Sequence, residues 1–484
     1  MVNVELNPVS VFHYFAEVCK VPRPSKKEEK IIAYLLDFAQ KHQLEVKTDE
    51  ANNVLIKKPA TPGKENLKTV ILQSHIDMVC EKNSDIEHDF LNDPIETYVD
   101  GEWMKAKGTT LGADNGIGIA TQLAVLAADD IEHGPIECLF TVDEETGLTG
   151  AFALKEGFMN GDILINLDSE DEGELFIGCA GGANTTAEFA YQPIEVPQNY
   201  FFFNVAIKGL TGGHSGDDIN KNRANANKLL NRFLYQLQDK YDFYLCQIDG
   251  GNLHNAIPRE ASALCAVPMK DKENVRIDMN VYTAEIENEF CVTEPNLRTE
   301  LSSESAVSHA IDRSVVKNLL KSVYAVHNGV YEWSQDMPGL VETSSNLASI
   351  KMVDDKIKIV TSQRSSILSS RKDMSEMIRA AFELGGAICT TGDGYPGWKP
   401  NPSSSILKVA IESYQRLFGV EPKVKAIHAG LECGLFLEKY PHLDMFSTGP
   451  TLRGVHSPDE RMLIPTVDKF WKHLLDVLVH VPEK

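Results

Sequence analysis

The first half of the chain alternates short apolar segments with helical patterns, and this alternation most constrains the fold. Residues 70–72, 136–142 and 163–167 are apolar runs typical of buried strands, and residues 117–128 have helical spacing. Strands separated by helices predict a mostly parallel sheet with helices on both faces. Ser25 and Glu28 have the spacing of a capping box, which predicts a helix beginning just after them. The expected fold class is α/β.

A change in the sequence pattern after Gly182 indicates a second domain. At 484 residues the chain is too long for one core, and residues 183–396 are more polar, with strand and helix patterns evenly mixed. The alternation of short apolar strands and helices returns in residues 397–484, with a helix at 405–418, strands at 424–427 and 444–447, and a helix from 467. We therefore expect one domain built from residues 1–182 and 397–484, with an α+β domain of residues 183–396 inserted.

The inserted segment contains two weakly similar halves. Residues 250–258 precede a predicted strand at 261–267 and a helix, and residues 342–349 precede a strand at 357–361 and a helix at 374–384. This pattern is consistent with an internal duplication.

Composition excludes some classes of function. A net charge of −23 argues against a nucleic-acid partner, because a phosphate-binding face needs clustered Lys and Arg. No apolar run is long enough to span a membrane, and residues 1–15 lack the pattern of a signal peptide. The nine cysteines lie singly, as buried thiols in a reducing compartment would. We expect a cytoplasmic protein without nucleic-acid or membrane partners.

Each predicted strand of the first half is followed by possible metal ligands. His75 and Asp77 follow the first, Glu144 and Glu145 the second, and Asp168 the third. In open parallel sheets, ligands bind beyond the carboxyl ends of the strands. A lone Glu-Glu or His-x-Asp is more often a solvated loop, but three such sites at successive strand ends favour a metal site.

Two Gly-containing loops supply further candidates. Asp114 lies in the Gly-rich turn of residues 108–118, and His456 lies in a loop after the strand at 444–447. A phosphate-binding loop is the alternative for the turn, but it lacks the Gly-Lys-Ser/Thr ending and the G-x-G-x-x-G fingerprint.

Taken together, these residues resemble a known family. His75-x-Asp77, Gly-Ala-Asp114-Asn, Glu144-Glu145, Asp168 and His456 match, in order and spacing, the co-catalytic zinc aminoacylase, carboxypeptidase and dipeptidase family. Longer segments, such as Gly-Thr-Thr-Leu-Gly-Ala-Asp-Asn-Gly-Ile-Gly and His-Ala-Gly-Leu-Glu-Cys-Gly-Leu-Phe, are similar to its aminoacyl-histidine dipeptidases. The resemblance covers roughly residues 8 to 480.

The resemblance implies a zinc-peptidase catalytic domain with two Zn²⁺ per subunit, or other divalent ions such as Co²⁺ or Mn²⁺. Asp114 would bridge the ions, one of which adds His75 and Asp168 and the other Glu145 and His456. Imidazole and carboxylate are suitable zinc ligands, and three protein ligands per ion leave room for water. The resemblance also implies a cis peptide bond between Asp114 and the next residue.

The same resemblance assigns two roles beside the metals. Glu144 would be the general base that takes a proton from water and passes it to the leaving amine. Asp77 would accept the second ring N–H of His75 and fix its tautomer.

In the family, the inserted domain is a lid that contributes to substrate and transition-state binding. His214 would hydrogen-bond the oxyanion, Arg364 would bind the substrate carboxylate, and Asn255 would assist. His214 and Asn255 lie in the first half of the insert and Arg364 in the second. One chain therefore supplies what shorter family members complete across two subunits.

The expected function is a two-zinc metallopeptidase that hydrolyses Xaa-His and related short peptides with a free C-terminus. A homodimer is the assembly that the resemblance suggests. One alternative is a cysteine amidohydrolase built on Cys433 and the nearby His428. The other is a peptide-binding protein with a purely structural metal site.

Overall fold

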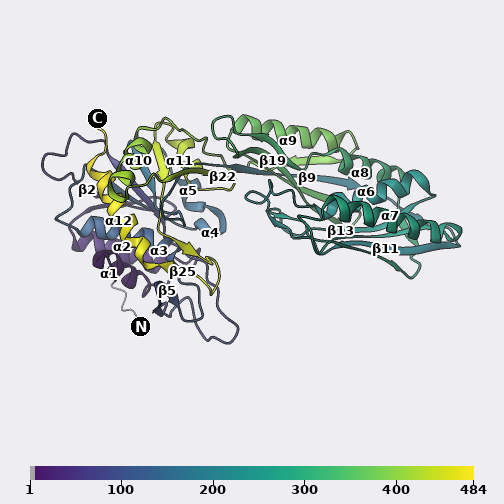
Figure 1. Ribbon diagram of the computed structural model, residues 1–484, viewed down its shortest axis with the longest axis horizontal. Coiled ribbons are helices and arrows are strands. Elements are labelled where there is room, and N and C mark those ends of the chain that lie inside the picture. Colours follow the sequence, from purple (N-terminus) through teal and green to yellow (C-terminus); the bar gives the residue numbers. More distant parts are fainter. Residues whose placement is uncertain (1–5) are drawn as a thin grey trace. The chain divides into compact units, whose positions relative to one another are not determined.

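The computed structural model describes residues 6–484, which form two compact units. The first unit comprises the described residues up to Gly178, together with Pro400–Ala426 and Leu431–Lys484. The second unit comprises Cys179–Lys399 together with Ile427–Gly430. The short 427–430 segment belongs to the second unit, whereas the sequence-based division placed it with residues 397–484. Figure 1 shows each unit with some of its elements labelled.

The first unit is built on an eight-stranded sheet of order β1-β2-β6-β3-β7-β23-β8-β22. The central pairs β6–β3, β3–β7 and β7–β23 are parallel, and β1–β2, β2–β6 and β23–β8 are antiparallel. Every residue of β3, β6 and β7 is buried, as the apolar runs predict. The strands are β1 (Glu45–Thr48), β2 (Val54–Lys58), β3 (Val70–His75), β6 (Ile136–Thr141), β7 (Ile163–Asn166), β8 (Glu174–Cys179), β22 (Lys423–Ile427) and β23 (Asp444–Ser447).

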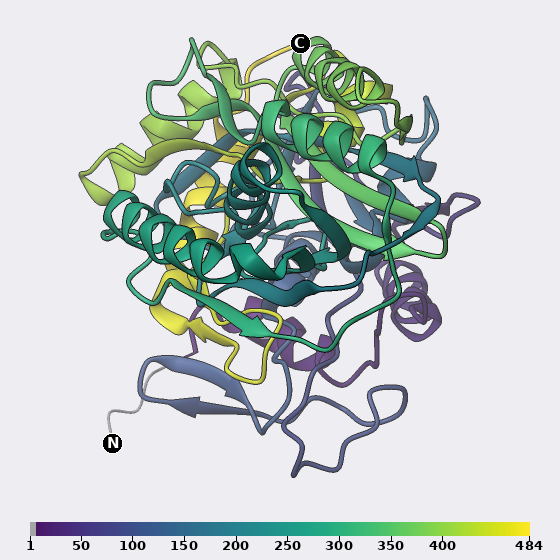
Figure 2. The same ribbon diagram turned by 90° about the vertical axis from the view of Figure 1, so that its right-hand side faces the viewer.

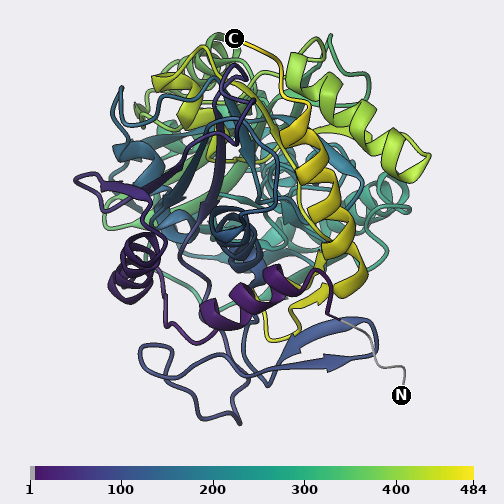
Figure 3. The same cartoon turned by 90° about the vertical axis from the view of Figure 1, so that its left-hand side faces the viewer.

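The described part of the first unit also contains eight helices and a small second sheet. Helices α1, α3 and α12 lie near one another, as Figure 3 shows. The helices are α1 (Val9–Val18), α2 (Glu29–Lys41), α3 (Ala113–Ala127), α4 (Glu144–Gly147), α5 (Thr149–Ala153), α10 (Ser405–Phe418), α11 (Cys433–Lys439) and α12 (Ile464–Val479). The small sheet, of order β24-β25-β5-β4, comprises β24 (Leu452–Arg453), β25 (Arg461–Leu463), β5 (Trp103–Ala106) and β4 (Thr97–Asp100).

The predicted capping box before α2 is wrong. The helix begins at Glu29, and its N-cap, Glu28, makes no capping hydrogen bond through its side chain. Ser25 instead donates from Oγ to Asp77 Oδ2 at 2.7 Å. The Glu28 carboxylate accepts the N–H of Lys26 and of Asp143. Tertiary hydrogen bonds to the loops after β3 and β6 therefore replace the local cap.

The second unit contains a nine-stranded sheet with helices α6 to α9 packed on one face (Figure 2). Its main order is β16-β11-β15-β13-β19-β20-β9-β21, and β18 pairs with β19. The strands are β9 (Gly181–Ala190), β11 (Tyr200–Lys208), β13 (Tyr244–Gly250), β15 (Ala261–Pro268), β16 (Arg298–Ser303), β18 (Gly329–Trp333), β19 (Val341–Val353), β20 (Lys356–Ser365) and β21 (Ile388–Thr391). The helices are α6 (Ala226–Lys240), α7 (Lys272–Glu289), α8 (Arg313–Ala325) and α9 (Leu368–Glu383).

Strand order in this sheet is the same when counted inward from either end. One half connects as β11-α6-β13-β15-α7-β16 and the other as β9-α8-β19-β20-α9-β21. In each half the first strand lies between the fourth and the third, and the second strand meets the other half at β13–β19. The second half starts with β9, so the whole first half is inserted after that strand. This arrangement supports the proposal of an internal duplication.

Two short ribbons complete the second unit: β10 (Pro193–Glu195) with β17 (His309–Ile311), and β12 (Gly213–His214) with β14 (Ala256–Ile257). Among residues 6–484, no helix is long and apolar enough to cross a membrane.

Candidate active site

Three neighbouring parallel strands of the first unit end where the predicted ligands begin. His75 is the last residue of β3 and is paired in register with Thr141 at the end of β6. Glu144 and Glu145 open α4, three residues beyond β6, and Asp168 lies two residues beyond β7. The polypeptide therefore brings these side chains to one edge of the sheet.

Asp114 lies between two histidines from distant parts of the chain. Its Oδ1 is 3.1 Å from His75 Nε2, and its Oδ2 is 3.1 Å from His456 Nε2. His75 Nε2 is also 3.4 Å from Asp168 Oδ1, and His456 Nε2 is 3.1 Å from Glu145 Oε2. The five predicted ligands thus form two groups that share Asp114, in the division that the resemblance implies. The peptide bond between Asp114 and Asn115 is cis.

These distances fit metal ligation. Two ligand atoms around one tetrahedral zinc, each ~2.0 Å from it, lie ~3.3 Å apart. Ligand atoms of His75, Asp114 and Glu145 lie within 4.8 Å of one another, so this group could hold a metal ion. The buried Oε1 of Glu145 has no hydrogen-bond partner within residues 6–484, which leaves it available to a cation. The donor set and its geometry therefore fit divalent metal ions.

Asp77 joins the His75 ring to the loop that carries Glu144. Its Oδ1 is 3.3 Å from His75 Nδ1 and accepts the N–H of Glu144 at 3.0 Å, and its Oδ2 accepts the N–H of Glu145 at 3.2 Å. Burial alone would raise the pKa of Asp77, but its hydrogen bonds to His75, Ser25 and the Glu144 N–H lower it to about 2. A permanent carboxylate therefore orients both the ring and the start of α4.

The carboxyl groups of the site differ in proton affinity. Removal from solvent raises the pKa of Glu144 well above its ordinary value, and Asp168, Glu432 and Glu145 add to this effect. Burial likewise raises the pKa of Asp168 to about 7. Glu144 belongs to neither of the two ligand groups around Asp114. A carboxylate with raised proton affinity suits a general base.

The second unit brings His214 and Arg364 together. Arg364 Nη2 lies 3.4 Å from His214 Nε2, although 150 positions separate the residues. The buried guanidinium also contacts Ser215 Oγ at 3.4 Å and the Tyr395 hydroxyl at 3.1 Å. Within residues 6–484, no carboxylate forms an ion pair with Arg364. A buried arginine without an acidic partner is suited to an anionic ligand.

Both nitrogens of the His214 ring have close polar neighbours. The N–H groups of Gly216 and Asp217 point to Nδ1 at 3.3 Å each, and the Arg364 guanidinium lies at Nε2. Asn255 is exposed, and its carbonyl accepts the N–H of Ser215 at 2.8 Å beside the β12–β14 ribbon. All three predicted residues of the second unit therefore lie in one neighbourhood.

Comparison with known proteins identifies a family that this chain matches. The model of peptidase family M20/M25/M40 matches residues 71–480, most of the chain. The chain belongs to this peptidase family. The predicted family, fold class and peptidase activity are confirmed.

Similarity to individual members extends over the full length. The chain is 43% identical over 480 residues to the cytosol non-specific dipeptidase of Escherichia coli, covering 99% of each chain. It is 44% identical to the crystal structure of an aminoacylhistidine dipeptidase from Vibrio alginolyticus, with a TM-score of 0.94 over 100% of this chain and 99% of that one. A tripeptidase from Staphylococcus aureus shares the fold at 17% identity, with a TM-score of 0.58 over 98% and 99% of the two chains.

Sequence reasoning missed several residues around the ligands. Arg23 and Glu460 bind the backbone of the turn that leads to Asp114. The Glu432 carboxylate accepts hydrogen bonds from Gln73 and Thr141, at 2.6 and 3.0 Å, beneath the strand ends. The available signal was that Gln73 lies two positions before His75, and therefore on the same face of β3. Arg23 and Glu460 carried no comparable signal.

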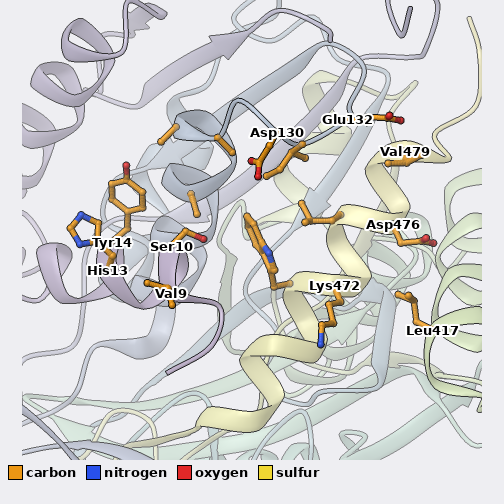
Figure 4. A pocket seen from close by; sticks show the side chains of 16 residues that line it. Val9, Ser10, His13, Tyr14, Asp130, Glu132, Leu417, Lys472, Asp476 and Val479 are labelled. Atoms are coloured by element: carbon orange, nitrogen blue, oxygen red, sulfur yellow. The ribbon is translucent and has the colours of Figure 1, made fainter. Parts of the chain in front are cut away.

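Two other features do not provide a competing site. Cys433, the nucleophile of the alternative amidohydrolase, is fully buried in the first unit, so a substrate could not reach it. A hollow of about 950 Å³ in the same unit, shown in Figure 4, lies among α1, α3 and α12. None of the predicted site residues lines it.

Proposed function

We propose that this chain is a two-zinc dipeptidase that uses Glu144 as its general base. The observation that carries the proposal is the position of Asp114, whose two oxygens face two different histidines, each with a further carboxylate beside it. One carboxylate shared by two ligand groups is suited to two ions held a few ångströms apart. A structural zinc site would instead be closed, and usually rich in cysteine.

Bound at these residues, two zinc ions would polarise the scissile carbonyl and lower the pKa of a water molecule. His75 and Asp168 would hold one ion, Glu145 and His456 the other, and Asp114 both. Asp77 keeps the proton of His75 on Nδ1, so that Nε2 offers its lone pair.

Glu144 moves the proton during hydrolysis. Its carboxylate takes a proton from the attacking water and delivers it to the peptide nitrogen as the C–N bond breaks. The raised pKa of Glu144 supports this role, because a carboxylate with higher proton affinity is a stronger base towards water. The hydrogen bond from its backbone N–H to Asp77 fixes the start of α4.

The second unit supplies positive charge and hydrogen-bond donors. We assign the His214 ring to the oxyanion of the tetrahedral intermediate and Arg364 to the C-terminal carboxylate of the substrate. Asn255 is assigned to the same substrate-binding group. The 3.4 Å between His214 and Arg364 supports their action within one chain.

The substrate class follows from the relatives. The Escherichia coli relative is named a cytosol non-specific dipeptidase and the Vibrio alginolyticus one an aminoacylhistidine dipeptidase. We extend both to this chain: it acts in the cytoplasm on dipeptides, Xaa-His among them, that have a free C-terminus. If the chain associates, we propose a homodimer.

Replacing Glu144 tests the proposal. Glu144→Ala should retain both metal ions yet lower kcat on Xaa-His dipeptides by about 10²–10⁴-fold, because the residue moves a proton and binds no ion. Metal analysis and steady-state kinetics give the two readouts. Glu156→Ala, which removes an exposed carboxylate twelve positions away, is the control and should match wild type. Near-normal turnover of Glu144→Ala would contradict the assignment.

A further inference from the structure

A single buried carboxylate binds the backbone that leads to Asp114. Glu460 Oε2 accepts the N–H of Leu111 at 2.8 Å and of Gly112 at 2.9 Å. Its Oε1 accepts the N–H of Ala113 at 2.8 Å and of Asp114 itself at 3.3 Å. Four successive N–H groups therefore converge on one side chain. The Gly-rich turn is an anion-binding loop after all, and its anion is a glutamate of the same chain.

Arg23 binds the same turn through its carbonyl groups. Its Nη2 donates to Gly112 O, and its Nη1 donates to Asp77 O at 2.7 Å and to Ile76 O at 3.2 Å. The guanidinium is buried, with 2% of its residue surface exposed. One fork of donors therefore joins the turn to the backbone that directly follows His75.

Two glycines of the turn make room for this guanidinium. A Cβ at Gly112 or at Gly116 would lie 2.7 Å from Arg23 Nη2, closer than side-chain carbons pack. Gly112 also has φ = 66°, which disfavours other residues. Two of the glycines that gave the turn the look of a phosphate loop, Gly112 and Gly116, are thus explained by the approach of Arg23.

The two side chains connect three segments that carry ligands. Glu460 lies four positions after His456, Arg23 contacts the segment just after His75, and both bind the turn of Asp114. These segments are distant in sequence, since 349 positions separate Glu460 from Leu111. The turn that ends in Asp114 is thereby bound through its N–H groups by Glu460 and through the Gly112 carbonyl by Arg23.

We propose that Glu460 and Arg23 are positioning residues that hold Asp114 between the two metal ions. The inference rests on the proposed function, in which Asp114 bridges the ions. Neither residue is proposed to contact a metal ion or the substrate. They act by keeping both Asp114 oxygens aimed at His75 and His456, so their loss should weaken metal binding and turnover together.

Glu460→Gln is the sharpest test, because it keeps the shape and replaces one acceptor oxygen with an NH₂ group that faces N–H donors. We expect the Kd for Zn²⁺, measured by chelator competition, to rise about 10–100-fold, and kcat to fall by a similar factor with KM little changed. In the Co²⁺-loaded protein the visible absorption bands should shift, since both ions share Asp114. Asp459→Asn, the same charge change at the exposed neighbouring residue, should match wild type.

Other outcomes separate the inference from simpler explanations. A Glu460→Gln protein with a lower Tm without metal but with wild-type Zn²⁺ affinity, kcat and Co²⁺ spectrum would make Glu460 merely structural and overturn the proposal. If this variant does not fold, Glu460→Asp and Arg23→Lys keep the charges and carry the same test with the same expected losses. Wild-type Zn²⁺ affinity in these two variants would overturn it equally. Wild-type protein that binds fewer than two ions, or Asp114→Asn with unchanged affinity, would contradict the proposed function itself.

Discussion

The two units gather side chains of opposite charge around their predicted site residues. In the first unit, hydrogen bonds with Asp114 and Glu145 raise the pKa of His456 to about 11. In the second unit, burial lowers the pKa of His428 to about 3, and the nearby Arg364 acts in the same direction. One environment favours a positive charge and the other disfavours one. A net charge summed over the whole chain conceals this difference, which is consistent with the proposed metal ions in the first unit and the proposed role of Arg364 in the second.

The units also differ in how they assemble these groups. In the first unit, parallel strands β3, β6 and β7 bring their carboxyl ends to one edge, so ligands lie directly after strands. In the second unit, Arg364 lies within β20, and His214 lies in a two-residue ribbon paired with Ala256. Their proximity depends on antiparallel register and on loop paths. The first arrangement is visible in a sequence and the second is not.

Removal of metal should have the largest effect and should separate the units. A chelator should abolish activity, and Zn²⁺ should restore it, because the proposed ions polarise the carbonyl and activate the water. Without a cation, the ligand carboxylates repel one another. Hydrogen exchange should quicken at the ends of β3, β6 and β7 and stay unchanged in β9 and β20. Activity that persists after complete removal of metal would contradict the assignment of the first unit.

Substitutions in the second unit should divide between kcat and KM. His214→Ala should lower kcat about 10²–10³-fold, because an oxyanion donor acts in the transition state. Arg364→Met should raise KM about 10–100-fold, the value of a charge-assisted contact to a carboxylate. A dipeptide amide, which lacks the carboxylate, is the matched substrate: wild type and Arg364→Met should hydrolyse it with equal kcat/KM.

Mixing the two impaired proteins tests whether these residues act within one chain. Since His214 and Arg364 lie 3.4 Å apart in the same unit, a mixture of His214→Ala and Arg364→Met should show only the sum of the two residual activities. Strong recovery would mean that the two groups meet across a subunit boundary.

Much of the first unit could be predicted from sequence because its signals are local. The apolar runs matched β3, β6 and β7, and the helix at 405–418 matched α10. His75 and Asp168 followed from the rule that ligands gather beyond parallel strands. Asp114 and His456 were candidates because of their Gly-containing loops, but their roles as ligands needed the family resemblance.

Other features depended on contacts that a sequence does not display. Ser25 fits a capping box by spacing, yet its hydroxyl donates to Asp77, 52 positions away. The Gly-rich turn resembled an anion loop, but nothing in the sequence identified Glu460 as the anion. In the second unit, β9 pairs with β20 across more than 160 positions, so the first half of the sheet is inserted inside the second. Long-range pairing of this kind leaves no periodic signal.

The smallest expected effect concerns stability, and it tests whether the second unit disfavours a positive charge on a buried histidine. His428 is buried, and its Nε2 lies 2.7 Å from Ser344 Oγ. Its pKa of about 3 in the folded protein lies below the ordinary value of 6.5, so the unfolded chain binds the proton more readily. The stabilising contribution of neutral His428 is therefore complete above pH 6.5 and is lost as the pH falls from 6.5 towards 3.

Urea unfolding between pH 8 and pH 5 measures this contribution as the difference between wild type and His428→Gln, whose neutral amide can still meet Ser344. Below pH 6.5 the wild type should lose up to about 1.4 kcal/mol per pH unit relative to the variant. Above pH 6.5 the difference should be constant, because neither state takes up a proton at this position. Parallel curves over the whole range would mean that His428 is charged or solvated in the folded protein, and that the second unit does not disfavour a positive charge at this position.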